Sequence, residues 1–218
     1  MSLLINGDFD MKLQIAKSNR QDAEHFLSGN VQNYCLPNYL VQHGYRLLVS
    51  AEKKNFEGLE QTICLIASGA DSSGAVYNEV AYKIKVLVRD VPNSYLRNKN
   101  ATQLLVWRSA SPKHDRILVG FATMMFKYLL DNHNIMITDE QQTEDGRRFW
   151  VRRILEAFEQ QDVSVSYIDL NDMGDDLSPR IYMINDDDEF FTDYYGKGWG
   201  NDEAHKNRVF VVSKQENL

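Results

Sequence analysis

The sequence predicts an α/β fold with a mixed central sheet flanked by helices. Strand-like and helix-like patterns alternate from Gln103 to Leu170, with short connections between them. Such alternation favours parallel pairing of consecutive strands. Upstream, the apolar runs Tyr45 to Ala51 and Gln61 to Ala67 are separated by a short polar segment, which favours antiparallel pairing. Both kinds of pairing together indicate a mixed sheet.

The central region is expected to contain three strands and two helices. In chain order they are a strand at Gln103 to Arg108, a helix at Arg116 to Asp131, a strand at Asn134 to Thr138, a helix at Thr143 to Gln161 and a strand at Val163 to Ile168. The first helix is apolar or small on nearly every side, so we expect it to be largely buried. The second carries many charges and is amphipathic.

The preceding region yields further elements. Ser18 to Leu27 is expected to be a helix with Ser18 as its capping residue. Val31 to Gln42 is expected to be a second helix, interrupted or restarted at Pro37. Glu79 to Asp90 alternates with a period of two, which predicts a strand with one face on a core.

Composition limits the classes of protein. The chain has 218 residues and no low-complexity linker, so we expect one domain, 1–218, ending in an acidic, aromatic elaboration. No apolar run approaches the roughly 20 residues of a membrane helix, and the first residues do not form a secretory signal. Cys35 and Cys64 lack metal-ligand spacing. We expect both to be reduced and partly buried, in a cytoplasmic protein.

Charge argues against nucleic acid as a partner, because the formal net charge is -7. One local exception is a set of four arginines in the second central helix: Arg147, Arg148, Arg152 and Arg153. They form either a basic patch or a solvated helix face that pairs with Glu144 and Glu156 at neighbouring helical positions.

The order of elements from Tyr45 to Ile168 resembles the fold of the GCN5-related N-acetyltransferases. In that family a strand leads to a turn of pattern Arg/Gln-x-x-Gly-x-Gly/Ala, whose amides at a helix start hold the pyrophosphate of acetyl-CoA. The matching stretch here is Arg116-Ile-Leu-Val-Gly120-Phe-Ala122, with one more residue between the arginine and the glycine. The resemblance implies acetyl-CoA as cosubstrate, bound by Arg116, Gly120, Phe121 and Ala122.

A second stretch looks like diverged acetyltransferase-like proteins of tailed bacteriophages. It reads Thr-Asp-Glu-Gln-Gln-Thr-Glu-Asp-Gly-Arg-Arg-Phe-Trp and ends at Trp150. The resemblance implies an acyl-CoA-dependent N-acyltransferase acting on an amine, carried by a small molecule or a protein, in a host cytoplasm. The alternative is a non-catalytic, degenerate member that serves as a protein-binding module.

Acyl transfer to an amine requires a base near the amine and an acid for the departing thiolate. Asp139 and Glu140 follow a predicted strand, where an α/β sheet opens its cleft, and Tyr167 could serve as the acid. The ligand is expected between the strand ends at Arg108 and Thr138. The five histidines are scattered and predict no nucleophile arrangement.

Three other segments leave alternatives open. Ser68 to Gly74 is either a plain loop or a phosphate-binding one, although it lacks the Walker and dinucleotide patterns. Asp186 to Glu189 is either a solvated acidic loop or a site for a hard cation. Tyr194 to Gly200 either covers a ligand or packs over the core. A last strand is expected at Arg208 to Ser213.

Overall fold

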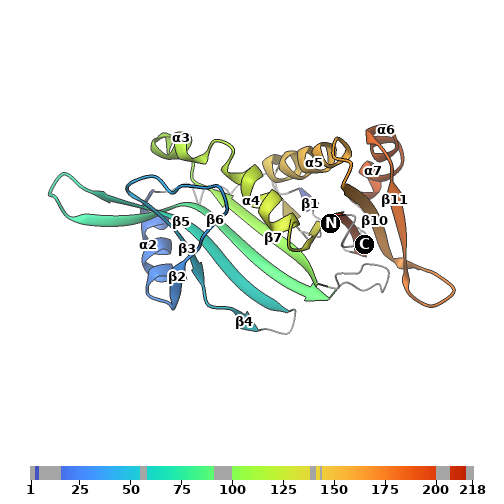
Figure 1. Cartoon of the computed structure of the whole chain (residues 1–218), viewed down its shortest axis with the longest axis horizontal. Coiled ribbons are helices and arrows are strands. Elements are labelled where there is room, and N and C mark those ends of the chain that lie inside the picture. The colour runs from blue at the N-terminus through green and yellow to red at the C-terminus, as the bar shows by residue number, and fades with distance from the viewer. Residues whose placement is uncertain are drawn as a thin grey trace. The chain divides into compact units, whose positions relative to one another are not determined.

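The computed structural model describes residues 3–4, 16–54, 58–90, 100–137, 141–142, 144–199 and 207–214. It is an α/β protein with a mixed sheet and flanking helices (Figure 1), as predicted. Backbone contacts group the described chain into two compact units, each of which we describe by itself. Unit 2 contains 16–54, 58–87 and 104–128, and unit 1 contains the remaining described residues.

Unit 2 is built on an antiparallel arrangement of strands. Its strands are β2 (Val31–Asn33), β3 (Tyr45–Ser50), β4 (Lys53–Lys54), β5 (Leu59–Ala70), β6 (Val76–Asp90) and β7 (Asn100–Arg108). They lie in the order β7-β6-β5-β3-β2, with β4 paired to β5. The predicted antiparallel pairing of β3 with β5 is confirmed, with Leu48 opposite Cys64.

The core of unit 2 includes helix α2 (Ala16–Leu27), whose Ala23 packs among Leu48, Cys64, Ile66 and Val80. This helix confirms the prediction for Ser18 to Leu27, although it begins earlier. Cys64 is fully buried, as the apolar run around it requires. The expectation that both cysteines are partly buried is wrong for Cys35, which is exposed.

The predicted helix from Val31 to Gln42 is wrong. Val31 to Asn33 pair antiparallel with β3 instead, so their backbone groups find hydrogen-bond partners in the sheet. The chain then turns at Pro37 and Asn38, and Asn38 has a φ of 60°, a left-handed conformation that a helix cannot contain.

The predicted helix from Arg116 to Asp131 is divided in two. A 3-10 turn, η1 (Pro112–His114), leads to the short α3 (Asp115–Leu118), and α4 (Phe121–Leu130) begins three residues later. Gly120 has a φ of 72°, so the right-handed helix cannot pass through it. Val119 is 80% exposed, although the apolar pattern alone would have buried it.

Unit 1 contains the parallel pairing that the central pattern predicts. Its elements include β8 (Asn134–Ile137), α5 (Glu144–Phe158), β10 (Val163–Met173), β11 (Pro179–Ile184) and β12 (Arg208–Lys214). Ala101 to Gln103 of β7 pair in parallel with β8. The predicted strand, helix, strand, helix, strand run is therefore confirmed. The last strand, β12, lies between β8 and β10 and is antiparallel to both.

The remaining elements of unit 1 are short. Between β11 and β12 lie α6 (Asp187–Glu189), the π-helical turn η2 (Phe190–Tyr194) and α7 (Tyr195–Gly198). Two further strands, β1 (Leu3–Leu4) and β9 (Gln141–Gln142), pair with each other in parallel. One core cluster of the unit gathers Met136, Ile168, Val209 and Val211 from three neighbouring strands.

Candidate functional site

The residues predicted to bind acetyl-CoA lie at the junction of α3 and α4 in unit 2. Arg116 is exposed on α3, and Gly120 is exposed between the helices. Phe121, the first residue of α4, is 2% exposed, and Ala122 is half-buried. Asp139, Glu140 and the strand end at Thr138 lie outside the described residues, so the predicted crevice is not described either.

The start of α4 is suited to an anion. Gly120 turns the chain, and its carbonyl accepts from the amide of Met124 at 3.0 Å. The amides of Phe121 and Ala122 precede the first helical hydrogen bond, so they have no acceptor within the helix. A methyl group at Gly120 would meet no atom within 4 Å. The glycine is therefore needed for its backbone conformation, and the space around it is open.

Tyr39 connects this helix start to a second group of residues. Its ring lies 5.2 Å from that of Phe121, between centroids. Its hydroxyl is buried and has no hydrogen-bond partner in the described part of the chain. Burial raises the pKa of Tyr39, and the neighbouring Tyr45 hydroxyl raises it further. Tyr39 therefore keeps its hydroxyl proton near neutral pH.

Three elements of unit 2 bring together a tyrosine, a histidine and a glutamate. The hydroxyl of Tyr45 on β3 lies 3.0 Å from Nδ1 of His114 in η1. Nε2 of the same imidazole lies 3.1 Å from Oε1 of Glu79 on β6, close enough for a charge interaction although not aligned as a hydrogen bond. His114 is 1% exposed and the Glu79 side chain 5% exposed, while Tyr45 is half-buried.

The partners of His114 indicate where its protons lie. A carboxylate only accepts, so the nitrogen facing Glu79 carries hydrogen in the neutral ring, and Nδ1 accepts from the Tyr45 hydroxyl. Burial lowers the pKa of His114, against the opposing influence of the Glu79 charge. Burial also raises the pKa of Tyr45, with a further contribution from Glu79. Near neutral pH the imidazole is therefore a base and the phenol an intact donor.

Glu79 has a second cationic neighbour. The ammonium of Lys113 is in contact with Glu79 Oε1. Burial alone would lower the pKa of Lys113, but the hydrogen bond and charge of Glu79 raise it above its ordinary value. Lys113 stays charged and pairs with Glu79 inside the protein, where an unpaired carboxylate would be costly.

The arrangement can move a proton from the surface of unit 2 inward. A group that gives a proton to Tyr45 would displace the Tyr45 proton onto His114, and Glu79 would stabilise the resulting imidazolium. Sequence reasoning missed this group because its members come from three separate segments. Tyr45 and His114 lie 69 positions apart, and no local pattern links them.

Tyr167, the predicted acid, belongs to unit 1. It is 3% exposed, and its ring lies 5.0 Å from Tyr194 and 5.6 Å from Phe210, between centroids. Tyr167 therefore lies buried among aromatic rings. Among the described candidates, Arg116, Gly120, Phe121 and Ala122 share one junction, and Tyr167 does not belong to that unit.

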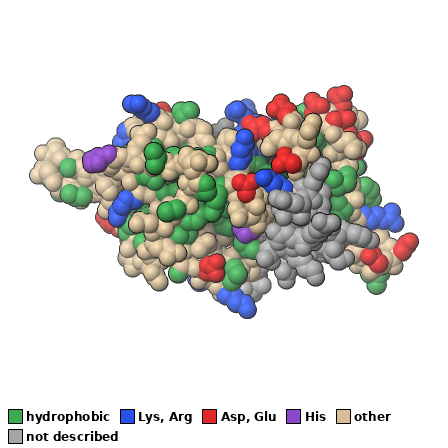
Figure 2. Space-filling view, in the orientation of Figure 1, with side chains coloured by type: hydrophobic (Ala, Val, Ile, Leu, Met, Phe, Trp, Pro, Cys, Tyr) green, Lys and Arg blue, Asp and Glu red, His purple; other side chains and the backbone are tan. Residues whose placement is uncertain are grey.

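The segments left open by the sequence have structural roles. Asp71 Oδ1 accepts from the amides of Ser73 and Ala75 at 2.9 Å and 3.0 Å, so a carboxylate already occupies the turn that a phosphate would need. Asp186 caps helix α6 by accepting a hydrogen bond from the amide of Glu189 at 2.8 Å. The carboxylates of this segment belong to a wider acidic surface, because Figure 2 shows acidic side chains gathered over the region of α5 and α6.

The arginines of α5 are mostly paired on a solvated face. Arg147 lies 2.7 Å from Glu144, and Arg152 lies 3.0 Å from Glu156. Arg153 differs, because its side chain is only 3% exposed and lies 2.6 Å from Glu156. The solvated-face interpretation therefore holds for the exposed arginines, and Arg153 is buried.

The aromatic run at Tyr194 to Trp199 packs over the core of unit 1. Trp199 is 7% exposed and stacks on Phe210 with 5.1 Å between ring centroids. This contact matches the alternative in which the run packs over the core, as opposed to the one in which it covers a ligand. Gly200 lies outside the described residues.

The described ranges show neither a candidate metal site nor a membrane-spanning helix. Within the described ranges, no group of three or more His, Cys, Asp or Glu side chains could hold a metal ion. None of the described helices is long and apolar enough to cross a membrane. No family model, curated protein or solved structure matches the chain.

Proposed function

We propose that this chain is an acyl-CoA-dependent N-acyltransferase that moves an acetyl group from acetyl-CoA to an amine. The observation that carries the proposal is the pairing, within unit 2, of an open helix start at Gly120 with the Tyr45, His114 and Glu79 relay. Tyr39 links the two through its contact with Phe121. The α/β fold with a mixed sheet is consistent with the family resemblance.

The anionic part of the cosubstrate would bind at the junction of α3 and α4. The free amides of Phe121 and Ala122 and the positive end of the helix dipole favour a phosphate group there. Arg116 is exposed and forms no ion pair with a described residue, so its guanidinium is available to a second phosphate oxygen.

The relay would supply the proton transfers. As the amine nitrogen bonds to the thioester carbonyl carbon, its proton passes to the Tyr45 oxygen, and the Tyr45 proton passes to His114 Nδ1. The carbon–sulfur bond then breaks, and the proton held on His114 returns through Tyr45 to the departing thiolate, which restores both residues. Glu79 acts through His114 by stabilising the imidazolium.

The acceptor is an amine of a small molecule or a protein, and nucleic acid is not the expected partner. The location we propose is the cytoplasm, which would be that of a host cell if a phage encodes the chain. A net charge of -7 fits a cationic amine as the approaching substrate.

Calorimetry with acetyl-CoA tests the proposal. We expect micromolar binding by the intact chain and a loss of about tenfold or more in Arg116→Ala, because a charge-assisted contact to phosphate is removed. Lys127→Ala is the matched control, since it removes an exposed cation from the opposite end of α4. Absence of binding at millimolar acetyl-CoA would favour a non-catalytic module that retains the fold.

A further inference from the structure

A cavity in unit 1 has residues that the proposed reaction does not use. Its volume is about 320 Å³, which is within the range of small-molecule sites. Strands β10, β11 and β12 and the segment of η2 and α7 contribute to its walls. Three tyrosines, Tyr167, Tyr182 and Tyr194, supply the aromatic lining.

A bulge in β10 brings two aspartates to this cavity. Tyr167 and Asp169 are two positions apart, so they share one face of the strand. Asp172 would point to the other face of a regular strand, but the register with β11 shifts between Ile168 and Met173. Ile168 pairs with Ile181 and Met173 with Pro179, so β10 has three more residues than β11 across this shift. This odd number returns Asp172 to the face of Asp169, and both line the cavity.

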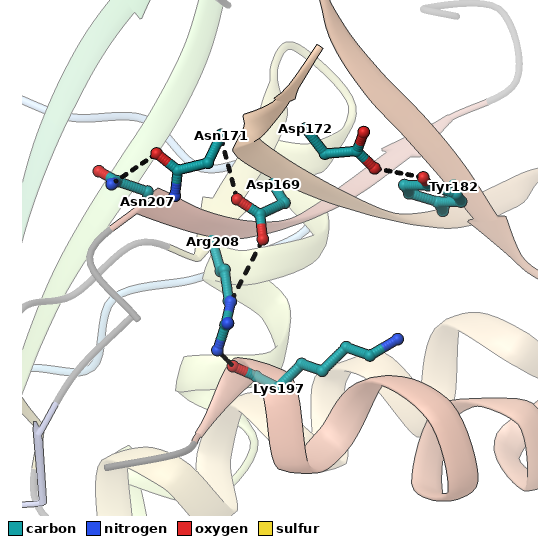
Figure 3. Close-up of polar contacts among 7 residues, drawn as sticks. All are labelled: Asp169, Asn171, Asp172, Tyr182, Lys197, Asn207 and Arg208. Carbon is teal, nitrogen blue, oxygen red and sulfur yellow. Dashed lines mark hydrogen bonds and ion pairs between the residues drawn. The ribbon is translucent and has the colours of Figure 1, made fainter. Parts of the chain in front are cut away.

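Both carboxylates are already engaged (Figure 3). Asp169 accepts from the amide of Asn171 at 3.0 Å and from Nε of Arg208 at 3.3 Å. Asp172 accepts from the hydroxyl of Tyr182, and this hydrogen bond raises the pKa of Tyr182. A cationic ligand would therefore have to displace existing partners before it could pair with either aspartate.

Lys197 is the cavity cation that remains available. Its carbonyl accepts from Nη1 of Arg208 at 3.0 Å, which fixes its backbone. Its side chain extends away from Arg208 (Figure 3) and holds the ammonium 5.0 Å from the centroid of the Tyr194 ring. Among the described residues, no carboxylate forms an ion pair with this ammonium. An anion entering the cavity therefore meets an available positive charge beside an aromatic ring.

The wall that carries Tyr194 and Lys197 is held in place at both ends. Phe190 is fully buried, with its ring 5.5 Å from that of Phe210, and Trp199 stacks on the same ring. The intervening backbone forms a π-helical turn, a rare conformation that is frequent at functional sites. The cavity is thus preformed by core packing on either side.

We propose that this cavity binds a small planar ring that bears an anionic group. The ring lies against the tyrosines, and the anionic group pairs with Lys197. Nucleoside monophosphates and aromatic carboxylates share this chemistry and fit the volume. The inference goes beyond the proposed acyl transfer, because its residues belong to unit 1 and the transfer residues to unit 2.

Calorimetry and saturation-transfer NMR on the full chain test the site with AMP, UMP, benzoate and indole-3-acetate as probes. Adenosine and benzamide serve as uncharged counterparts. We expect at least one anionic probe to bind at submillimolar concentration and to weaken by about tenfold or more in Lys197→Met. Tyr194→Phe should retain binding and Tyr194→Ser should weaken it, because the ring supplies the stacking surface.

Two controls separate this site from general charge effects and from the acetyl-CoA proposal. Arg152→Met removes another exposed cation of unit 1, with a side chain 76% exposed, and should leave probe binding unchanged. Arg116→Ala should also leave probe binding unchanged. Failure of the acetyl-CoA proposal would therefore not count against the cavity in unit 1, and the two proposals can fail separately. The proposal is overturned if no anionic probe binds at millimolar concentration. Equal binding by Lys197→Met, or of the uncharged counterparts, would overturn it too.

Discussion

The Tyr45 hydroxyl and Nδ1 of His114 lie 3.0 Å apart, joining β3 to the turn that precedes α3. The rings meet edge to face, with 5.8 Å between their centroids. Tyr45 is the half-buried member and His114 the buried one, so the pair connects solvent to the interior of unit 2. Glu79 and Lys113 balance charge behind the imidazole.

Removing the Tyr45 hydroxyl should impair transfer while leaving the cosubstrate bound. In Tyr45→Phe we expect the rate of CoA release with an amine acceptor to fall about 100-fold or more, the usual scale for general acid–base catalysis. Acetyl-CoA affinity by calorimetry should stay within about twofold, because no phosphate contact is lost. The readout is thiol release followed over a panel of amines.

Tyr34→Phe is the matched control, because it removes another tyrosine hydroxyl of unit 2 that hydrogen-bonds Tyr128 away from His114. An unchanged rate of CoA release in Tyr45→Phe would show that the relay takes no part in acyl transfer. A rate loss of equal size in Tyr34→Phe would indicate a general effect of destabilisation.

Stability should depend on pH through His114. Burial lowers its pKa in the folded state, so the unfolded chain takes up the proton first as pH falls. The groups facing the imidazole are Tyr45, Glu79, Lys113 and Asp115. The contribution is fully present above the unfolded pKa of about 6.5 and is lost as pH falls below that value toward the folded pKa.

Urea unfolding of the parent and of His114→Gln at several pH values between about 5 and 8 measures this effect. The parent should lose more stability on acidification than His114→Gln does. His133 is half-buried, and burial also lowers its pKa. The parent curve alone is therefore not diagnostic, and the difference between the two curves is the quantity that reports on His114. Parallel curves would show that His114 does not titrate with unfolding.

Much of the fold followed from local pattern, and the site largely did not. The period of two in β6 and the apolar stripe of α4 are local properties, because each strand or helix must bury one face. The break at Gly120 escaped prediction because apolar residues continue through Val119. His114 looked like a scattered histidine, since its partners Tyr45 and Glu79 are adjacent only after the sheet forms.

Substitution of Gly120 should act through backbone strain. In the largely buried helix that the sequence predicts, a large side chain at this position would overpack the core. Gly120 is instead exposed, and the space beside it is open. At a φ of 72°, Gly120→Ala should cost about 1 to 2 kcal/mol of unfolding free energy. Gly120→Trp should cost a similar amount, and Gly120→Asn less, because asparagine tolerates this conformation.

Urea unfolding of the three variants distinguishes the two causes. A cost that grows with side-chain volume from alanine to tryptophan would restore overpacking as the explanation. A cost that is similar for alanine and tryptophan and smaller for asparagine would establish that the left-handed conformation is the constraint.

The two cysteines should differ sharply in reactivity. Cys64 is fully buried in the core of unit 2, and burial raises the pKa of its thiol to about 12, so almost no thiolate exists near neutral pH. Cys35 is exposed, so a reagent can reach it. Iodoacetamide at about pH 8 should therefore add one group to the folded chain, at Cys35, and two groups in denaturant.

Intact-mass and peptide mass spectrometry measure the outcome, with Cys35→Ser as the control that should remain unmodified while folded. Rapid modification of Cys64 in the folded chain would mean that the core around Ala23, Leu48 and Ile66 opens on the timescale of labelling.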